Sequence, residues 1–265
     1  MAYQDILYDV ADAVATVTID RPEVMNAFRA QTCEELIAAL STAGWDRSIG
    51  VIVLCGAGER AFCTGGDQKA PAGGGAAGGY GGRGIIGIPV QELHGAIRNA
   101  PKPVIAKVRG YAIGGGNVLA AVCDLTIAGE GAVFGQVGPG MGSVDPGFGT
   151  AYLARLVGEK KAREMWYLCR RYSAAEALAM GLVNAVVPDG ELDAEVARWC
   201  AEITGKSPTA IALAKSSINA DSDHIAGIAN LGFNALKLYL GTDESREGGE
   251  AFRDKRKPDF RKHLK

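Results

Sequence analysis

Short apolar runs that alternate with helical segments are the feature that most limits the folds open to this chain. Residues 51–54, 104–108 and 125–128 are mostly Val, Ile, Leu and Ala. Runs of this length and composition are typical of strands buried on both faces of a sheet. Residues 13–19 form a further strand with alternating valines and threonines, and residues 31–45 have apolar side chains at helical spacing. Strands separated by helices predict an α/β fold rather than a β-sandwich.

The second half of the chain is mostly helical in pattern. Helices are predicted at 152–157, 160–168, 174–180, 192–204, 209–220 and 225–240. A proline at position 208 marks a boundary, and a chain of 265 residues is long enough for a large domain with a helical appendage. We therefore expect a core domain over residues 1–207 and a helical region over residues 208–265.

Charge and cysteine usage exclude several classes of function. The formal net charge is −2, so nothing predicts a nucleic-acid partner. Six cysteines and three histidines are scattered without the spacing of a metal site. Cysteines inside apolar runs, such as Cys55, behave as small buried hydrophobes and are typical of a reducing cytosol. The N-terminus lacks a signal-peptide core and no run is long enough to span a bilayer, so a cytoplasmic protein is predicted.

Two glycine clusters each follow a predicted strand. The first is AFCTGGD at residues 61–67 and the second is GYAIGGGN at residues 110–117, which leads into an apolar helix. Glycines at the start of a helix leave backbone N–H groups uncovered and favour bound negative charge. A GGG run alone is more often a tight turn, and neither cluster has a phosphate-loop pattern. Brought together, two such donors would form an oxyanion hole.

A glycine-rich segment follows the first cluster. Nine of the fifteen residues from Gly73 to Gly87 are glycine, so the segment buries too little apolar surface to offset its ordering entropy. A tolerated surface insertion is one interpretation. The adjoining pair Gly65–Gly66 favours the other, a mobile lid over a site.

The two glycine clusters, the intervening Pro-Lys-Pro-Val at 101–104 and the CDLTIA segment at 123–128 together resemble the crotonase (enoyl-CoA hydratase/isomerase) superfamily. The resemblance covers essentially the whole chain. It implies a spiral of ββα turns with a C-terminal helical trimerisation region, assembled as a trimer or hexamer. It also implies an acyl-coenzyme A substrate whose thioester oxygen is held by the amides of Gly66 and Gly115.

Hydratases of this family carry two glutamates that this chain lacks. At the corresponding positions the sequence has Val118 and Gly138. Addition of water to a double bond needs an acid–base pair, so simple hydration is not expected.

The segment FGQVGPGMGSVDPGFG at residues 134–149 resembles a narrower branch of the family. This branch includes 2-ketocyclohexanecarboxyl-CoA hydrolase, which the sequence resembles more, and 1,4-dihydroxy-2-naphthoyl-CoA synthase. The hydrolase opens a ring and the synthase closes one. The resemblance implies that Asp145 is the base and that Ser143 orients water or the ketone. An aspartate before a proline is otherwise a common turn residue, and a serine hydroxyl commonly bonds a turn backbone.

The branch also uses a tyrosine where this chain has Leu240. Tyr239 stands immediately before it, although adjacent residues on a helix point in different directions. Either Tyr239 or Tyr80, in the glycine-rich segment, is a candidate proton donor.

For coenzyme A, the resemblance implies contacts from Arg21, Val24 and Gly65, and from Lys255 and Phe252 in the C-terminal tail of a neighbouring subunit. A solvated basic tail is the plainer interpretation of the residues near Lys255. No permanent cofactor is expected, although the synthase alternative, compatible with Gly138, would add bicarbonate. The histidines His94, His224 and His263 are expected to be structural or exposed, and Asp67 is expected to cap or charge the start of a helix. A noncatalytic, RNA-binding member of the fold is a further alternative, which the net charge disfavours.

Overall fold

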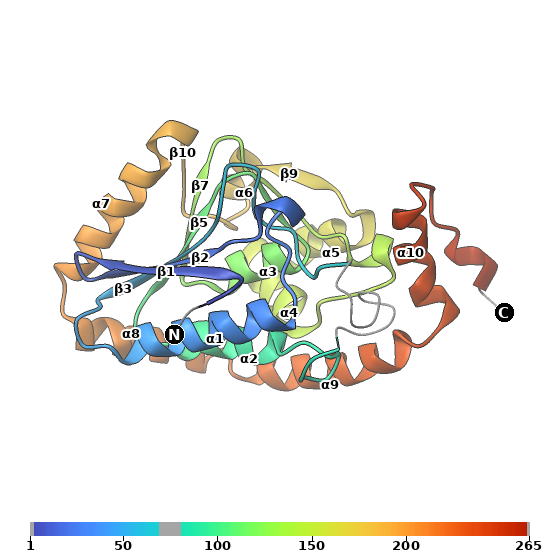
Figure 1. Ribbon diagram of the computed structural model, residues 1–265, viewed down its shortest axis with the longest axis horizontal. Helices are drawn as coiled ribbons and strands as arrows, with labels where there is room; N and C mark the ends of the chain where they lie inside the picture. The colour runs from blue at the N-terminus through green and yellow to red at the C-terminus, as the bar shows by residue number, and fades with distance from the viewer. Residues whose placement is uncertain (1–2, 69–80, 264–265) are drawn as a thin grey trace.

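Two β-sheets with helices packed around them form the protein in a computed structural model, which describes residues 3–68 and 81–263 (Figure 1). The strands are β1 (Ile6–Ala11), β2 (Val14–Ile19), β3 (Val51–Gly56), β4 (Ala61–Cys63), β5 (Val104–Val108), β6 (Tyr111–Ile113), β7 (Leu125–Gly129), β8 (Val133–Gly135), β9 (Arg171–Ser173) and β10 (Ala185–Val187). The α-helices are α1 (Ala30–Trp45), α2 (Val90–Asn99), α3 (Gly115–Val122), α4 (Ala151–Val157), α5 (Glu159–Leu168), α6 (Ala174–Ala179), α7 (Leu192–Thr204), α8 (Pro208–Ala220), α9 (His224–Tyr239) and α10 (Asp243–Arg253). The α/β prediction is confirmed.

The strands divide between the sheets in a repeating way. The larger sheet has the order β1-β2-β3-β5-β7-β10 and is parallel except for the β1–β2 pair. The smaller sheet has the order β4-β6-β8-β9, with only β8–β9 antiparallel. Each of the strands β3, β5 and β7 is followed by a short strand that joins the smaller sheet. The chain therefore winds through both sheets once per turn, as expected for a ββα spiral.

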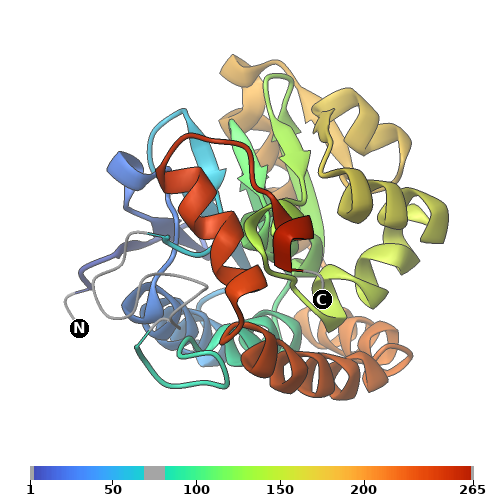
Figure 2. The same ribbon diagram turned by 90° about the vertical axis from the view of Figure 1, so that its right-hand side faces the viewer.

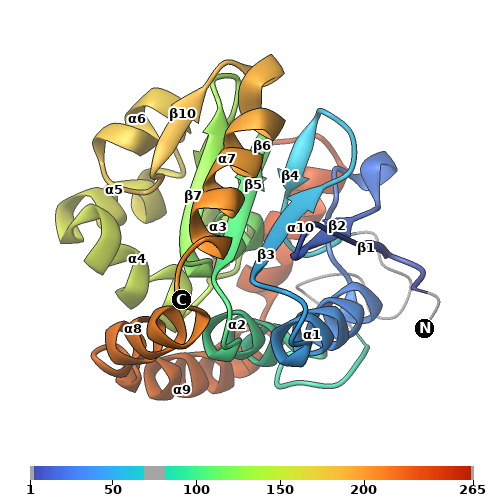
Figure 3. The same ribbon diagram turned by 90° about the vertical axis from the view of Figure 1, so that its left-hand side faces the viewer.

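Strand β3 shows why these runs are apolar throughout. Side chains alternate between the two faces of a strand. Ile52 and Leu54 enter the main core, whereas Val51 and Val53 pack with residues of α7, such as Val196, on the other face. Figure 3 shows α7 lying across the larger sheet. Both faces of β3 are buried, so this strand has no solvent-facing side that would require polar residues.

Four helices, α1, α2, α8 and α9, form a layer along one side of the sheets (Figures 1 and 3). Beyond α9 the chain turns into α10, which packs against the 3-10 turn at Gly138–Met141 (Figures 1 and 2). The predicted helices of the second half are confirmed to within one or two residues at each end. The division of the chain at residue 207 stays a prediction, although α8 begins at Pro208 with the Ser207 hydroxyl as its cap.

Candidate active site

A cavity of about 580 Å³ lies where the two glycine clusters meet. The first cluster follows β4, and the second links β6 to α3. The wall is mostly apolar and includes Ile86, Ile88, Val90, Val144, Leu236 and Leu240. Ile86 belongs to the described part of the glycine-rich segment, whereas residues 69–80 of that segment lie outside the described residues.

The glycine clusters bring two backbone donors to the cavity. Phe28 bridges the first cluster: its N–H donates to Gly65 O and its carbonyl accepts from Asp67 N, both at 2.8 Å. Gly66, between these two, has no hydrogen-bond partner for its N–H within the described residues. Gly115 opens α3, where the first N–H groups have no partner in the helix. Gly66 and Gly115 both line the cavity, so the paired donors predicted from the sequence lie together.

Close approach explains why these positions are glycine. Gly65 has φ +85°, and a Cβ atom on it would lie 2.9 Å from Gly115 N. A Cβ atom on Gly115 would lie 2.6 Å from the ring of Phe28. Any side chain would push the two clusters apart.

Asp145 and Ser143 lie on the loop that follows β8, and both line the cavity. Asp145 is half-buried, and desolvation by the surrounding protein raises its pKa to about 6. No hydrogen bond or ion pair to its carboxylate occurs within residues 3–68 and 81–263. The loop is held by the Trp166 indole, which donates to Gly149 O at 2.6 Å. A half-buried carboxylate with a pKa near neutrality is suited to act as a base.

Positions 118 and 138, where hydratases of the family carry glutamates, have no acid–base group in this chain. Val118 is buried within α3. Gly138 lines the cavity, but a Cβ atom there would lie 2.6 Å from Ser143 O and 2.7 Å from the Trp166 ring, so no side chain fits. Among the described residues of the wall, the carboxylates are Glu23, Asp67 and Asp145.

Arg21 is placed differently from its predicted role as a coenzyme A contact. It is buried and forms an ion pair with Asp67 at 2.9 Å and a longer one with Asp5 at 3.7 Å. It also donates to the carbonyl of Ala27. Arg21 is not among the described residues that line the cavity. Its guanidinium already contacts Asp67, Asp5 and the Ala27 carbonyl, so it stabilises the turn that precedes Ala27. Val24 and Gly65 do line the cavity, where the prediction put them.

The C-terminal segment reaches the cavity of its own chain. Phe252, near the end of α10, lines the cavity. Helix α10 approaches the 138–142 turn so closely that a Cβ atom on Gly248 would collide with Met141 and Gly142. Lys255 is exposed, has φ +54° and is not part of the described wall, so the structure gives it no contact with the cavity.

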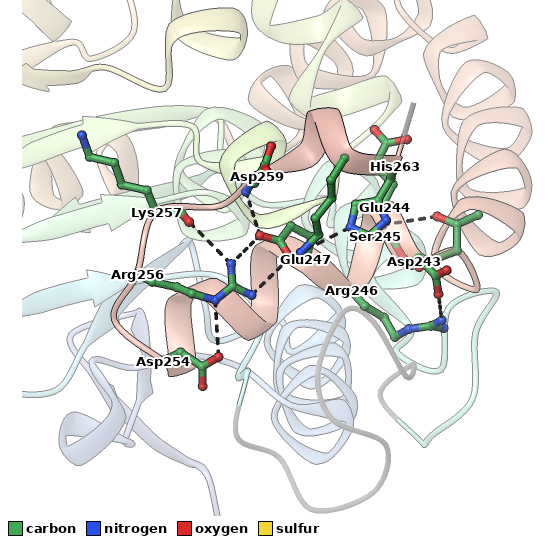
Figure 4. Close-up of polar contacts among 12 residues, drawn as sticks. Asp243, Glu244, Ser245, Arg246, Glu247, Asp254, Arg256, Lys257, Asp259 and His263 are labelled. Carbon is green, nitrogen blue, oxygen red and sulfur yellow. Dashed lines mark hydrogen bonds and ion pairs between the residues drawn. The ribbon is translucent and has the colours of Figure 1, made fainter. Parts of the chain in front are cut away.

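A buried glutamate holds the tail beyond α10 in place. Glu247 accepts hydrogen bonds from Arg256 at 2.5 Å, from Lys262 at 2.6 Å and from the Asp259 N–H at 2.7 Å (Figure 4). Its side chain is 1% exposed. These donors hold the pKa of Glu247 well below its usual range. The tail is thereby folded back onto the helix that carries Phe252.

The tyrosine candidate within the described residues, Tyr239, is not part of the cavity wall. Leu240 lines it, whereas Tyr239 is absent from the described wall and its hydroxyl lies 3.4 Å from Glu244 Oε1. The two residues are adjacent on a helix end and point in different directions. Tyr80 lies outside the described residues.

His94 is structural, as expected. It is buried, its ring packs edge-on against Phe148 with centroids 5.5 Å apart, and burial lowers its pKa to about 4. The described residues contain no cluster of side chains that could hold a metal ion. None of the described helices is long and apolar enough to cross a membrane.

Sequence reasoning missed Arg171 and Tyr111, which also line the cavity. Both belong to three-residue strands of the smaller sheet. Strands so short show little periodicity, so only the sheet register places these side chains at the site.

Comparison with known proteins agrees with this geometry. A sequence model of the enoyl-CoA hydratase/isomerase family matches residues 9–263. An enoyl-CoA hydratase from Mycobacterium avium subsp. paratuberculosis K-10 is 31% identical, with a TM-score of 0.86 over 97% of this chain and 99% of that one. An enoyl-CoA hydratase from Bacillus anthracis is also 31% identical, with a TM-score of 0.73 over 97% and 98% of the two chains. The chain has the crotonase fold and belongs to the enoyl-CoA hydratase/isomerase family.

Proposed function

We propose that the protein processes acyl-CoA thioesters and, within this class, hydrolyses a carbon–carbon bond of a cyclic 2-ketoacyl-CoA such as 2-ketocyclohexanecarboxyl-CoA. The observation that carries the proposal is Asp145, a carboxylate with a raised pKa in the same cavity as the Gly66 and Gly115 amides. The structural relatives are named enoyl-CoA hydratases. Val118 and Gly138 supply no carboxylates for hydration of a double bond. Their identity supports a different reaction at the Gly66 and Gly115 amides.

The chemistry follows from these groups. Asp145 takes a proton from water, and the hydroxide adds to the ring ketone. The bond between the former ketone carbon and the carbon next to the thioester then breaks. Its electron pair forms a thioester enolate, whose oxygen accepts hydrogen bonds from Gly66 and Gly115 N–H. Return of the proton to the enolate carbon leaves a carboxylic acid at one end and the thioester at the other, here pimeloyl-CoA.

The remaining wall suits such a substrate. Leu236, Leu240, Ile86 and Ile88 offer an apolar surface to an alicyclic ring. In this proposal the Ser143 hydroxyl, which lines the cavity on the loop that carries Asp145, orients water or the ketone. Val24 and Gly65 would contact coenzyme A where it approaches the glycine clusters.

Mass spectrometry of products tests the proposal. Incubation with 2-oxocyclohexanecarboxyl-CoA in H₂¹⁸O should give pimeloyl-CoA, with one labelled oxygen in the new carboxylate. Asp145→Asn should form it at least about 100-fold more slowly. Unchanged substrate after prolonged incubation with the folded wild type would contradict ring opening for this acyl group.

Ring closure of the 1,4-dihydroxy-2-naphthoyl-CoA synthase type is a second candidate, and one observation favours it. Gln136 is fully buried, and neither polar atom of its amide has a hydrogen-bond partner within the described residues. Near Gly138, this amide fits a small anion such as bicarbonate, which would supply a base. Loss of water from o-succinylbenzoyl-CoA, at a rate that depends on added bicarbonate, would support this candidate over the hydrolase.

We also propose that the protein forms a homotrimer or hexamer. Large apolar side chains stand exposed on α8 and α9, at Leu213, Ile218, Leu231 and Leu238. Such a surface is typical of a face covered by another chain. Light scattering after size exclusion would measure the subunit number, and a monomer at micromolar concentration would contradict the proposal.

A further inference from the structure

Arg171 is the one basic side chain among the described residues that line the cavity. It begins β9, where it pairs with Gly135 of β8, and Gly135 pairs in turn with Ile113 of β6. The three residues therefore form one row across the smaller sheet. Ile113 stands two residues before the Gly115 donor.

The side chain of Arg171 lies over this row. A Cβ atom on Gly135 would lie 3.3 Å from its Nη1 atom and 3.5 Å from its Cδ atom. Neighbouring strands are about 4.8 Å apart, so the guanidinium lies within roughly one strand spacing of Ile113. Glycine at 135 leaves the space that the side chain occupies. The charge is thus directed toward the end of β6, beside the candidate oxyanion hole.

Within residues 3–68 and 81–263, the side chain of Arg171 makes no ion pair and no hydrogen bond, so its charge has no counter-ion among the described residues. The groups that act on it electrostatically are Cys169 and Tyr111, and neither a thiol nor a phenol is a carboxylate counter-ion. Arg171 is exposed to solvent in the isolated chain, and the protein around its stem still desolvates it enough to lower its pKa. A guanidinium in this condition favours an anionic ligand with two oxygens, which its fork binds in pairs.

We propose that Arg171, assisted by the hydroxyl of Tyr111, binds the distal carboxylate of a dicarboxylic acid mono-CoA thioester. This inference rests on the proposed function, since ring opening creates such a carboxylate within the cavity. The phosphates of coenzyme A are a poorer match, because the long pantetheine arm separates them from the thioester. Arg171 lies beside the donors that hold that thioester.

The new carboxylate forms near Asp145, another anion. A cation elsewhere on the wall draws the product carboxylate away from the base and opposes re-closure of the ring. The same contact would make the cavity prefer dicarboxylic thioesters over monocarboxylic ones of equal length.

Calorimetric binding of pimeloyl-CoA, heptanoyl-CoA and free coenzyme A tests this inference. The two acyl chains have equal length and differ only in the carboxylate. The wild type should bind pimeloyl-CoA about tenfold or more tightly than heptanoyl-CoA, as charge-assisted pairs do. Arg171→Gln should abolish this preference and leave the affinity for heptanoyl-CoA unchanged, and Arg171→Lys should keep part of it.

Arg170→Gln is the matched control. The side chain of Arg170 is exposed and lies outside the described cavity wall, although the residue is next to Arg171 in the sequence. An equal loss of affinity for all three ligands in Arg171→Gln would reveal a phosphate contact and overturn the proposal. Equal binding of pimeloyl-CoA and heptanoyl-CoA by the wild type would by itself overturn the proposal. Binding is measured apart from turnover, so a carboxylate preference without ring opening would refute the proposed function and leave this inference intact.

Discussion

The backbone nitrogen of Gly115 lies 2.9 Å from the position that a Cβ atom would take on Gly65. Gly65→Ala should therefore separate the two donor clusters and also strain a residue with φ +85°. We expect kcat to fall at least about 100-fold, the loss typical of a displaced oxyanion donor. Steady-state kinetics would measure it. Gly190→Ala is the control, because no atom lies within 4 Å of its Cβ position and its φ is not positive. Full activity in Gly65→Ala would exclude these amides from the reaction.

Asp145→Asn should lower kcat by about 100-fold or more, the range of general base catalysis, without weakening the binding of coenzyme A. In the wild type the ionised carboxylate is the active form. Because burial raises the pKa of Asp145 to about 6, kcat/KM should rise with pH through this value and then level off. A pH–rate profile would check this. An Asn variant that retains the wild-type rate and profile would remove Asp145 from the mechanism.

Arg21→Gln should destabilise the protein rather than weaken coenzyme A binding. The change removes the buried guanidinium that pairs with Asp67 and, at longer range, with Asp5, whose pair with Arg29 remains. Loss of a hydrogen bond to a charged group typically costs about 1.5–3 kcal/mol. Chemical denaturation would measure the free energy of unfolding, and calorimetry the affinity for coenzyme A. Arg47→Gln, at an exposed position, serves for comparison. Unchanged stability with weakened coenzyme A binding would restore the ligand contact predicted from the sequence.

Glu247→Gln should release the tail beyond α10 and raise KM, because Phe252 would lose its support. Hydrogen exchange at residues 254–263 should accelerate. Since folding lowers the pKa of Glu247 below its ordinary value near 4.5, the stabilisation is present above that pH and is lost as pH falls below it. The difference between wild type and variant should therefore shrink in acid. Glu250→Gln, exposed on the same helix, should behave as wild type.

Tyr239→Phe should keep kcat within about twofold, since Leu240, and not Tyr239, is among the described residues that line the cavity of this chain. Leu240→Ala should lower kcat/KM about tenfold, the scale for lost apolar contact with a substrate. Kinetics on both variants would check this. A large loss in Tyr239→Phe alone would mean that its hydroxyl acts elsewhere, in the cavity of another copy.

The α/β class of the core was predictable because its central strands are buried on both faces, whereas the spiral was implied by the family resemblance. Val51 and Ile52 both had to be apolar, so the pattern was visible in the sequence. Helix α10 was not predicted as a helix, because it packs through Gly248 and Gly249, which carry no apolar signal. The ion pairs of Arg21 could not be predicted, since its acidic partners Asp5 and Asp67 are distant in sequence. The paired glycine clusters were predicted because each is joined to a strand, whereas Asp145 was assigned to the same site by the family resemblance.

The donors proposed at the centre of this site belong to the main chain. No substitution of a side chain can delete an amide hydrogen of Gly66 or Gly115 unless it displaces the backbone or introduces proline. Residues around the donors, such as Asp145 and Leu240, can change without removing them. In such a scaffold, backbone amides stabilise the negative charge and the surrounding side chains determine the substrate. One reaction can therefore be exchanged for another by replacing a few of these side chains.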